Sequence, residues 1–168
     1  MPTRMDLARL YDEHRQGLFS LALSVVRDRA AAEDAVHDAF ARMLGREGSE
    51  DSPGDPVAYA FRAVRNAAID RQRRASAMGR ALHDAPASLF DAPPRDPLID
   101  EEVSQLVQDA IDNLPDAARQ TLVMRVYGGL TFDQIARALD EPLGTVTTRY
   151  RRTLDKLRES LGVLAPVK

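Results

Sequence analysis

Cysteine and tryptophan are missing from this sequence of 168 residues, and aromatic residues make up only 5% of it. Without cysteine the chain forms no disulfides and offers no thiolate ligands to a metal, which fits a reducing compartment. Its apolar runs are far too short to cross a bilayer, and residues 1–10 carry acidic and basic side chains in place of a signal-peptide core. We therefore expect a cytoplasmic protein without membrane insertion.

The sequence motifs of common enzymes are absent as well. There is no glycine-rich phosphate loop, no His-Glu-x-x-His zinc motif and no Gly-x-Ser-x-Gly elbow. The three histidines, His14, His37 and His83, have no obvious triad partner or second metal ligand. We therefore expect no catalytic residue, no metal site and no cofactor.

The net charge of −3 is unevenly distributed. Residues 81–100 hold one Arg against four Asp, so this stretch accounts for the net charge. In contrast, residues 62–80 hold six Arg against one Asp, and residues 149–158 hold five basic residues against one Asp. Two local basic surfaces in a weakly acidic chain predict weak, salt-sensitive binding to free DNA, and a partner that holds the protein there.

Helical periodicity dominates the first half of the chain. Apolar residues recur on one face over residues 6–26, 30–44 and 55–74, and the last two segments begin with Asp28 and with Asp55 followed by Pro56, which are helix-start signals. Cationic side chains near the end of the third segment also suit the helix dipole, but that effect needs only one or two of them. The excess indicates a surface that faces phosphates.

Residues 81–100 contain four Pro and four Asp and no apolar periodicity, which is typical of a flexible linker. Residues 45–56 form a loop rich in Gly, Ser, Pro and carboxylates. We therefore predict an all-α fold of two small helical domains, residues 1–80 and 101–168, joined by a flexible, acidic, Pro-rich linker at residues 81–100.

The second domain ends in a predicted helix-turn-helix. Helices are expected over residues 101–113, with Val103, Leu106 and Ile111 inward, and over 117–127, capped by Asp116 and packing Leu122, Val123 and Val126. Thr131 and Gln134 form a capping box for the next helix, and Pro142 and Gly144 interrupt it before a last helix from about residue 145. Thr and Arg side chains on that last helix suit a DNA major groove, although a plain helical hairpin with solvated arginines has the same pattern.

Taken together, the chain resembles bacterial alternative sigma factors of the extracytoplasmic-function group in the sigma-70 family. The likeness rests on AAAEDAVHDAFARML (30–44), DPVAYAFRAVRNAAIDRQRR (55–74) and LPDAARQTLVMRVYGGLTFDQIARALDEPLGTVTTRYRR (114–152). Tyr59 replaces the family's usual Trp. The resemblance implies a factor that binds core RNA polymerase, directs it to promoter DNA and helps open the duplex, and it adds an anti-sigma factor as an expected partner.

The resemblance also implies the site residues. Contacts with the clamp helices of polymerase fall to Asp34, Asp38 and Phe40, although an acidic strip on a helix is more often a solvated face. The loop at 45–54 lies where the family grips a flipped base. The predicted −10 contacts are Arg62, Arg65, Asn66, Asp70, Arg73 and Arg74. The predicted −35 contacts are Thr145, Thr147, Thr148, Arg149, Arg151 and Arg152.

Two other functions account for parts of the same pattern. A sigma-like decoy would bind an anti-sigma protein without touching DNA, but it would not need two basic surfaces. An autonomous helix-turn-helix repressor would bind an operator as a dimer without polymerase, and it would not need a helix for melting DNA.

Overall fold

The computed structural model describes residues 4–46, 54–79 and 101–162, and those residues form seven helices and no strand. The helices are α1 (Arg4–Val26), α2 (Arg29–Leu44), α3 (Pro56–Ala77), α4 (Glu101–Asp112), α5 (Asp116–Val126), α6 (Phe132–Leu139) and α7 (Leu143–Leu161). The all-α fold class is therefore confirmed. The predicted linker at 81–100 and most of the predicted loop at 45–56 lie outside the described residues.

Local capping explains where several helices begin. The Asp28 carboxylate accepts a hydrogen bond from the Ala31 N–H (2.8 Å), and Asp55 accepts one from the Ala58 N–H (3.0 Å). Thr131 and Gln134 form the predicted capping box, with hydrogen bonds of 3.2 and 3.0 Å. Because each cap satisfies N–H groups that have no partner inside the helix, these starts are encoded locally.

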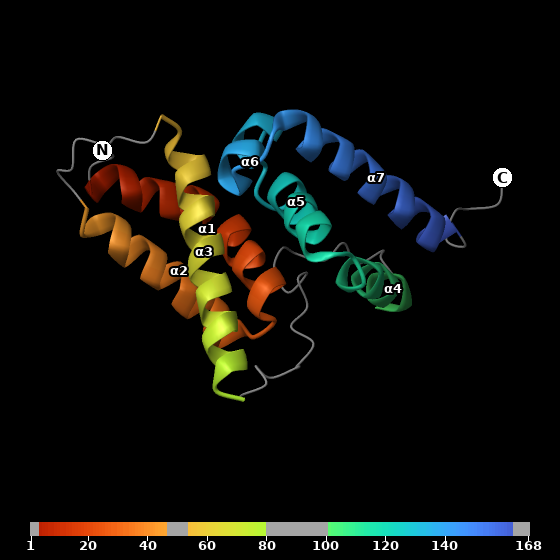
Figure 1. Ribbon diagram of the computed structural model, residues 1–168, viewed down its shortest axis with the longest axis horizontal. Helices are drawn as coiled ribbons and strands as arrows, with labels where there is room; N and C mark the ends of the chain where they lie inside the picture. The colour runs from red at the N-terminus through yellow and green to blue at the C-terminus, as the bar shows by residue number, and fades with distance from the viewer. Residues whose placement is uncertain (1–3, 47–53, 80–100, 163–168) are drawn as a thin grey trace.

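Helices α1, α2 and α3 pack on one another on one side of the molecule, and α4 to α7 lie on the other (Figure 1). Leu18, Leu21, Phe61 and Val64 are completely buried in the first group, and Val123, Ile135 and Val146 are completely buried in the second. Between the groups, α1 packs against α5 and α3 against α6, so one continuous apolar cluster joins them.

Four predictions for the C-terminal half were wrong in detail. Leu106 and Val126 are 49% and 57% exposed instead of inward, because helical spacing does not say whether a neighbouring element covers a face. Asp116 is the first residue of α5 and not its cap; its carboxylate accepts a hydrogen bond from Arg119 Nη1 (3.1 Å). Helix α7 begins at Leu143 with Pro142 as N-cap, two residues before the predicted start.

Candidate nucleic-acid interface

The apolar stripe of α3 fixes which of its polar residues reach solvent. Phe61, Val64 and Ala68 are fully buried against the other helices. Residues on the opposite side of a 3.6-residue helix must therefore face outward. Of the predicted −10 contacts, Arg62, Asn66, Arg73 and Arg74 are exposed, and Arg65 and Asp70 are partly buried.

A polar pocket lies beside this face, between α2 and the first turns of α3. It has a volume of about 470 Å³, and its polar lining comes from Arg42, Arg46, Tyr59, Arg62 and Asn66. Arg46 donates a hydrogen bond from Nη1 to the Tyr59 hydroxyl (3.4 Å). An aromatic ring among guanidinium groups can stack a base and hold its phosphate. Arg42 and Arg46 were not among the predicted contacts, although Arg46 lies within the predicted base-gripping loop and Arg42 lies three residues before it.

The exposed side of α7 carries the predicted −35 contacts. Thr145, Arg151 and Arg152 are exposed, whereas Thr147, Thr148 and Arg149 are partly buried. Thr147 donates a hydrogen bond from Oγ1 to the Gly144 carbonyl (3.1 Å), which orders the first turn. The structure thus brings all six residues to one end of α7.

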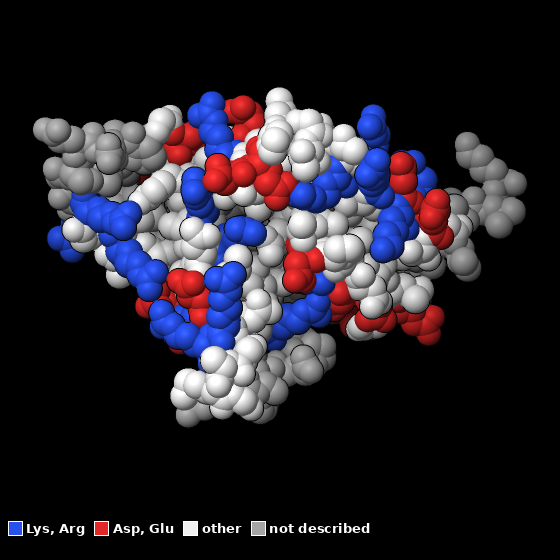
Figure 2. All heavy atoms as spheres, in the orientation of Figure 1, with Lys and Arg blue, Asp and Glu red and all other residues white. Residues whose placement is uncertain are grey.

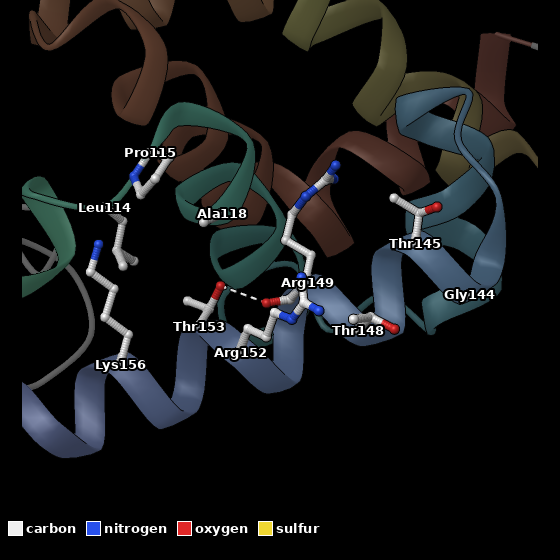
Figure 3. Close-up of a pocket in the computed structure, with 10 residues that line it drawn as sticks. All are labelled: Leu114, Pro115, Ala118, Gly144, Thr145, Thr148, Arg149, Arg152, Thr153 and Lys156. Carbon is white, nitrogen blue, oxygen red and sulfur yellow. Dashed lines mark hydrogen bonds between the residues drawn. The ribbon is translucent and has the colours of Figure 1, made fainter.

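Figure 3 shows a pocket of about 570 Å³ between α7 and the start of α5. Its basic lining residues are Arg149, Arg152 and Lys156. The side chains of Arg149 and Arg152 point in different directions. The Arg149 side chain extends away from Arg152 and toward the first group of helices. Thr153 holds the helix here by donating from Oγ1 to the Arg149 carbonyl (2.7 Å).

Arg149 forms an ion pair with Glu141, in the turn of the helix-turn-helix. Its Nη2 lies 2.6 Å from Glu141 Oε2, and the side chains are only 22% and 28% exposed. Pairs of this kind are stronger than exposed ones because partial burial shields the two charges from water. Arg149 is therefore less available to a ligand than Arg151 or Arg152.

Arg65 of α3 approaches the same turn from the other group of helices. Its Nε donates to Gln120 Oε1 of α5 at 2.6 Å. Burial lowers the pKa of Arg65, Glu141 counteracts this by raising it, and the positive charges of Arg149 and Arg62 lower it further. The predicted −10 and −35 surfaces therefore meet around Glu141.

The predicted polymerase contacts on α2 are partly engaged within the chain. Arg71 of α3 lies 2.6 Å from Asp38 and 3.6 Å from Asp34, whose side chains remain 45% and 60% exposed. Phe40 is only 8% exposed and packs edge-on against Tyr11, with ring centroids 5.2 Å apart. A partner can therefore reach the two carboxylates more easily than the Phe40 ring.

Figure 2 shows basic side chains gathered over α3 and along α7 on one face of the molecule, with acidic side chains between them. Within residues 4–46, 54–79 and 101–162, no group of three or more His, Asp or Glu side chains could hold a metal ion. None of the helices in these ranges is long and apolar enough to cross a membrane. The basic side chains over α3 and α7, with the threonines of α7, offer guanidinium and hydroxyl groups for recognising an anionic polymer.

Both halves of the chain match regions of a known protein family. Residues 10–78 match the family model for sigma-70 region 2, and residues 110–159 match sigma-70 region 4. The extracytoplasmic-function sigma factor SigK of Mycobacterium sp. (strain KMS) is 28% identical, and the alignment covers 93% of this chain and 83% of SigK. SigK of Mycolicibacterium vanbaalenii is 29% identical over 93% of this chain and 82% of the relative.

The fold also resembles that of a solved sigma factor, RpoE of Bartonella quintana, in complex with the anti-sigma factor NepR. The TM-score is 0.69 at 20% identity, and the match covers 95% of this chain and 96% of the other. The chain therefore belongs to the sigma-70 family, and it is an alternative sigma factor of the extracytoplasmic-function group, which directs RNA polymerase to promoters.

Proposed function

We propose that residues 1–80 bind core polymerase and open the −10 element, and that residues 101–168 read the −35 element, with residues 81–100 as the linker. The observation that carries this division is that each matched region contributes one helix, α3 or α7, with a basic exposed face. In this proposal the protein acts in the cytoplasm and has no catalytic residue, because melting requires only that the open strand be bound more tightly than the duplex.

At the −35 element, Arg151 and Arg152 are proposed to read bases. An arginine can donate two hydrogen bonds to O6 and N7 of a guanine, and Thr145, Thr147 and Thr148 can contact phosphates or a thymine methyl group. Both arginines are exposed, which supports this role. Arg149 can contact bases in the same way only when its ion pair with Glu141 is broken.

At the −10 element, the pocket between α2 and α3 is proposed to take an unpaired base. Tyr59 would stack on the base, and Arg46, Arg62 and Asn66 would contact its edge or the backbone. Extruding a base costs a few kcal/mol, which stacking and phosphate contacts offset. Arg65, Asp70, Arg73 and Arg74 would guide the strand along α3.

Core polymerase would contact Asp34 and Asp38 on α2, together with the edge of Phe40. A carboxylate pair that is about half exposed can exchange Arg71 for a basic residue of the partner. An anti-sigma factor is proposed as a further partner, supported by the fold shared with a sigma factor solved in such a complex.

Run-off transcription with reconstituted core polymerase tests these roles. Arg152→Ala should cost about 1–3 kcal/mol, roughly 5- to 150-fold, at promoters that present its base and should relax specificity there. Arg73→Ala with Arg74→Ala should weaken all promoters and lower the salt slope. Arg158→Ala is the matched control, because this exposed arginine lies at the far end of α7.

Equal transcription by all of these variants would contradict the assigned roles. A chain that binds an anti-sigma factor but never core polymerase would be a decoy. Tight footprinting of an operator without polymerase would instead indicate an autonomous repressor.

A further inference from the structure

The turn between α6 and α7 holds Glu141 in a fixed backbone conformation. The Glu141 N–H donates to the Ala136 carbonyl of α6 (3.0 Å), and Asp140 before it has a left-handed conformation (φ 55°). Pro142 after it is the N-cap of α7, and the Pro142 carbonyl accepts a hydrogen bond from the Thr145 N–H (3.0 Å). Because a residue that precedes proline is confined to extended conformations, little backbone freedom remains at Glu141. The turn therefore presents the Glu141 carboxylate to α7 from a defined position.

The main chain of Arg149 lies among the residues proposed to read the −35 element. Thr145 precedes Arg149 by about one helical turn, Arg152 follows it by three residues, and all three line the pocket shown in Figure 3. The Arg149 side chain extends away from Arg152, and its Nη2 lies 2.6 Å from Glu141 Oε2. Arg149 thus has the helix position of a DNA-reading residue, while Glu141 directs its guanidinium elsewhere.

The ion pair uses only part of the Arg149 guanidinium. A guanidinium has five N–H donors, and Arg149 Nη1 is buried without a hydrogen-bond partner among the residues that the structure describes. Glu141 thus neutralises the charge of Arg149 but leaves a donor unsatisfied, which is unfavourable in a partly buried site. O6 and N7 of a guanine accept two hydrogen bonds from one guanidinium. The negative charge of Glu141 is therefore what keeps Arg149 from a base.

We propose that Glu141 is a specificity-determining residue for the −35 element, which acts by holding Arg149 away from the DNA. It is a positioning residue, because it acts through Arg149 and does not itself contact a base. While the ion pair is intact, Arg151 and Arg152 read bases and Arg149 does not. When Glu141 is neutralised, Arg149 adds a preference for guanine at one further position. This inference rests on the proposed −35 role of α7.

Base preference is measured with holoenzyme formed from the full chain and core polymerase. The templates derive from a promoter that the wild-type holoenzyme transcribes, with its −35 element randomised, and those that the holoenzyme binds are recovered and sequenced. Glu141→Gln should enrich guanine about fivefold at a position where wild type does not prefer it, which is the lower end of what one base-reading arginine provides. Glu141→Ala, which removes the acceptor altogether, should enrich the same base at least as much.

A double variant tests whether the new preference depends on Arg149. Arg149→Ala, alone or combined with Glu141→Gln, should lack the additional guanine preference. Asp140→Asn is the matched control, because it removes one negative charge from the same turn and asparagine tolerates the left-handed conformation. It should keep the wild-type base preference. Glu141 also acts electrostatically on Arg65, a proposed −10 contact, so only −35 positions are compared.

Unchanged −35 preferences in both Glu141→Gln and Glu141→Ala would overturn the inference. So would an additional guanine preference that persists without Arg149 or that also arises in Asp140→Asn. Stronger binding to all −35 sequences alike would overturn it too, because the released guanidinium would then contact phosphates. In each case the proposed −35 function stands if Arg152→Ala relaxes the wild-type preference. If the wild-type holoenzyme has no −35 preference, the proposed role of α7 is itself wrong, and the inference with it.

Discussion

The two basic helices α3 and α7 divide their arginines in the same way. On α3, Arg65 is hydrogen-bonded to the other domain, whereas Arg73 and Arg74 are exposed. On α7, Arg149 is paired with Glu141, whereas Arg151 and Arg152 are exposed. Each helix therefore has at least one inner arginine held by the protein, with Arg71 a second on α3, and outer arginines that face solvent. Arginines on the same helix can therefore have different roles, and burial and neighbouring side chains decide which arginine has which role.

The largest expected effect comes from Arg119, which is the most deeply buried arginine of the residues that the structure describes. Its side chain donates to the carbonyls of Ser24, Asp112 and Leu114 and pairs with Asp116. Arg119→Met should lower the free energy of unfolding by about 3 kcal/mol, because several buried carbonyls lose their donor. Urea denaturation measures this loss. Changing the exposed Arg137 to Ala should lower the free energy of unfolding by less than about 1 kcal/mol. Equal losses in the two variants would contradict the conclusion that buried and exposed arginines have different roles.

A double-mutant cycle compares two ion pairs made by arginines of α7. The partly shielded pair of Arg149 and Glu141 should show a coupling energy of about 1–3 kcal/mol, because little water screens its two charges. The pair of Arg158 and Asp155 (3.5 Å, side chains 79% and 60% exposed) should show under about 1 kcal/mol. Thermal unfolding of the single and double variants provides both values, and a larger coupling for the exposed pair would reverse the comparison.

The smallest expected effect is a pH dependence at Tyr127, which follows α5 where the two groups of helices meet. Burial raises the pKa of Tyr127 from 10.0 to about 12. The folded state therefore keeps this proton longer than the unfolded state. Its contribution is fully present below about pH 10 and is lost as the pH rises toward 12. Urea midpoints at pH 9 and pH 11 should differ more for wild type than for Tyr127→Phe. An identical loss in the variant would mean that Tyr127 does not contribute.

Local sequence signals identified most of the fold. The caps at Asp28, Asp55 and Thr131 place helix starts because their hydrogen bonds span only three residues. The positions of Leu106 and Val126 were wrong because a helical stripe shows which residues share a face, and not whether another helix covers it. Exposure of an apolar residue is thus settled by packing and not by periodicity.

The basic surfaces were visible in the charge distribution, but the contacts between the two groups of helices were not. Gly17 and Gly128, and likewise Arg65 and Gln120, are far apart in the chain and carry no local signal that they touch. Glu141 directly precedes Pro142 in the chain, and no sequence motif distinguishes it. Its ion pair with Arg149 forms within the helix-turn-helix, whereas its electrostatic effect on Arg65 arises only where the two halves pack together.

The most direct test of the central claim is permanganate reactivity of unpaired thymines at the −10 element, using holoenzyme formed from this chain and core polymerase. Wild type and Arg158→Ala should both give reactive thymines, and Arg62→Ala with Arg65→Ala should abolish most of the signal while polymerase binding persists. Undiminished reactivity in the double variant would contradict the claim that α3 opens promoter DNA.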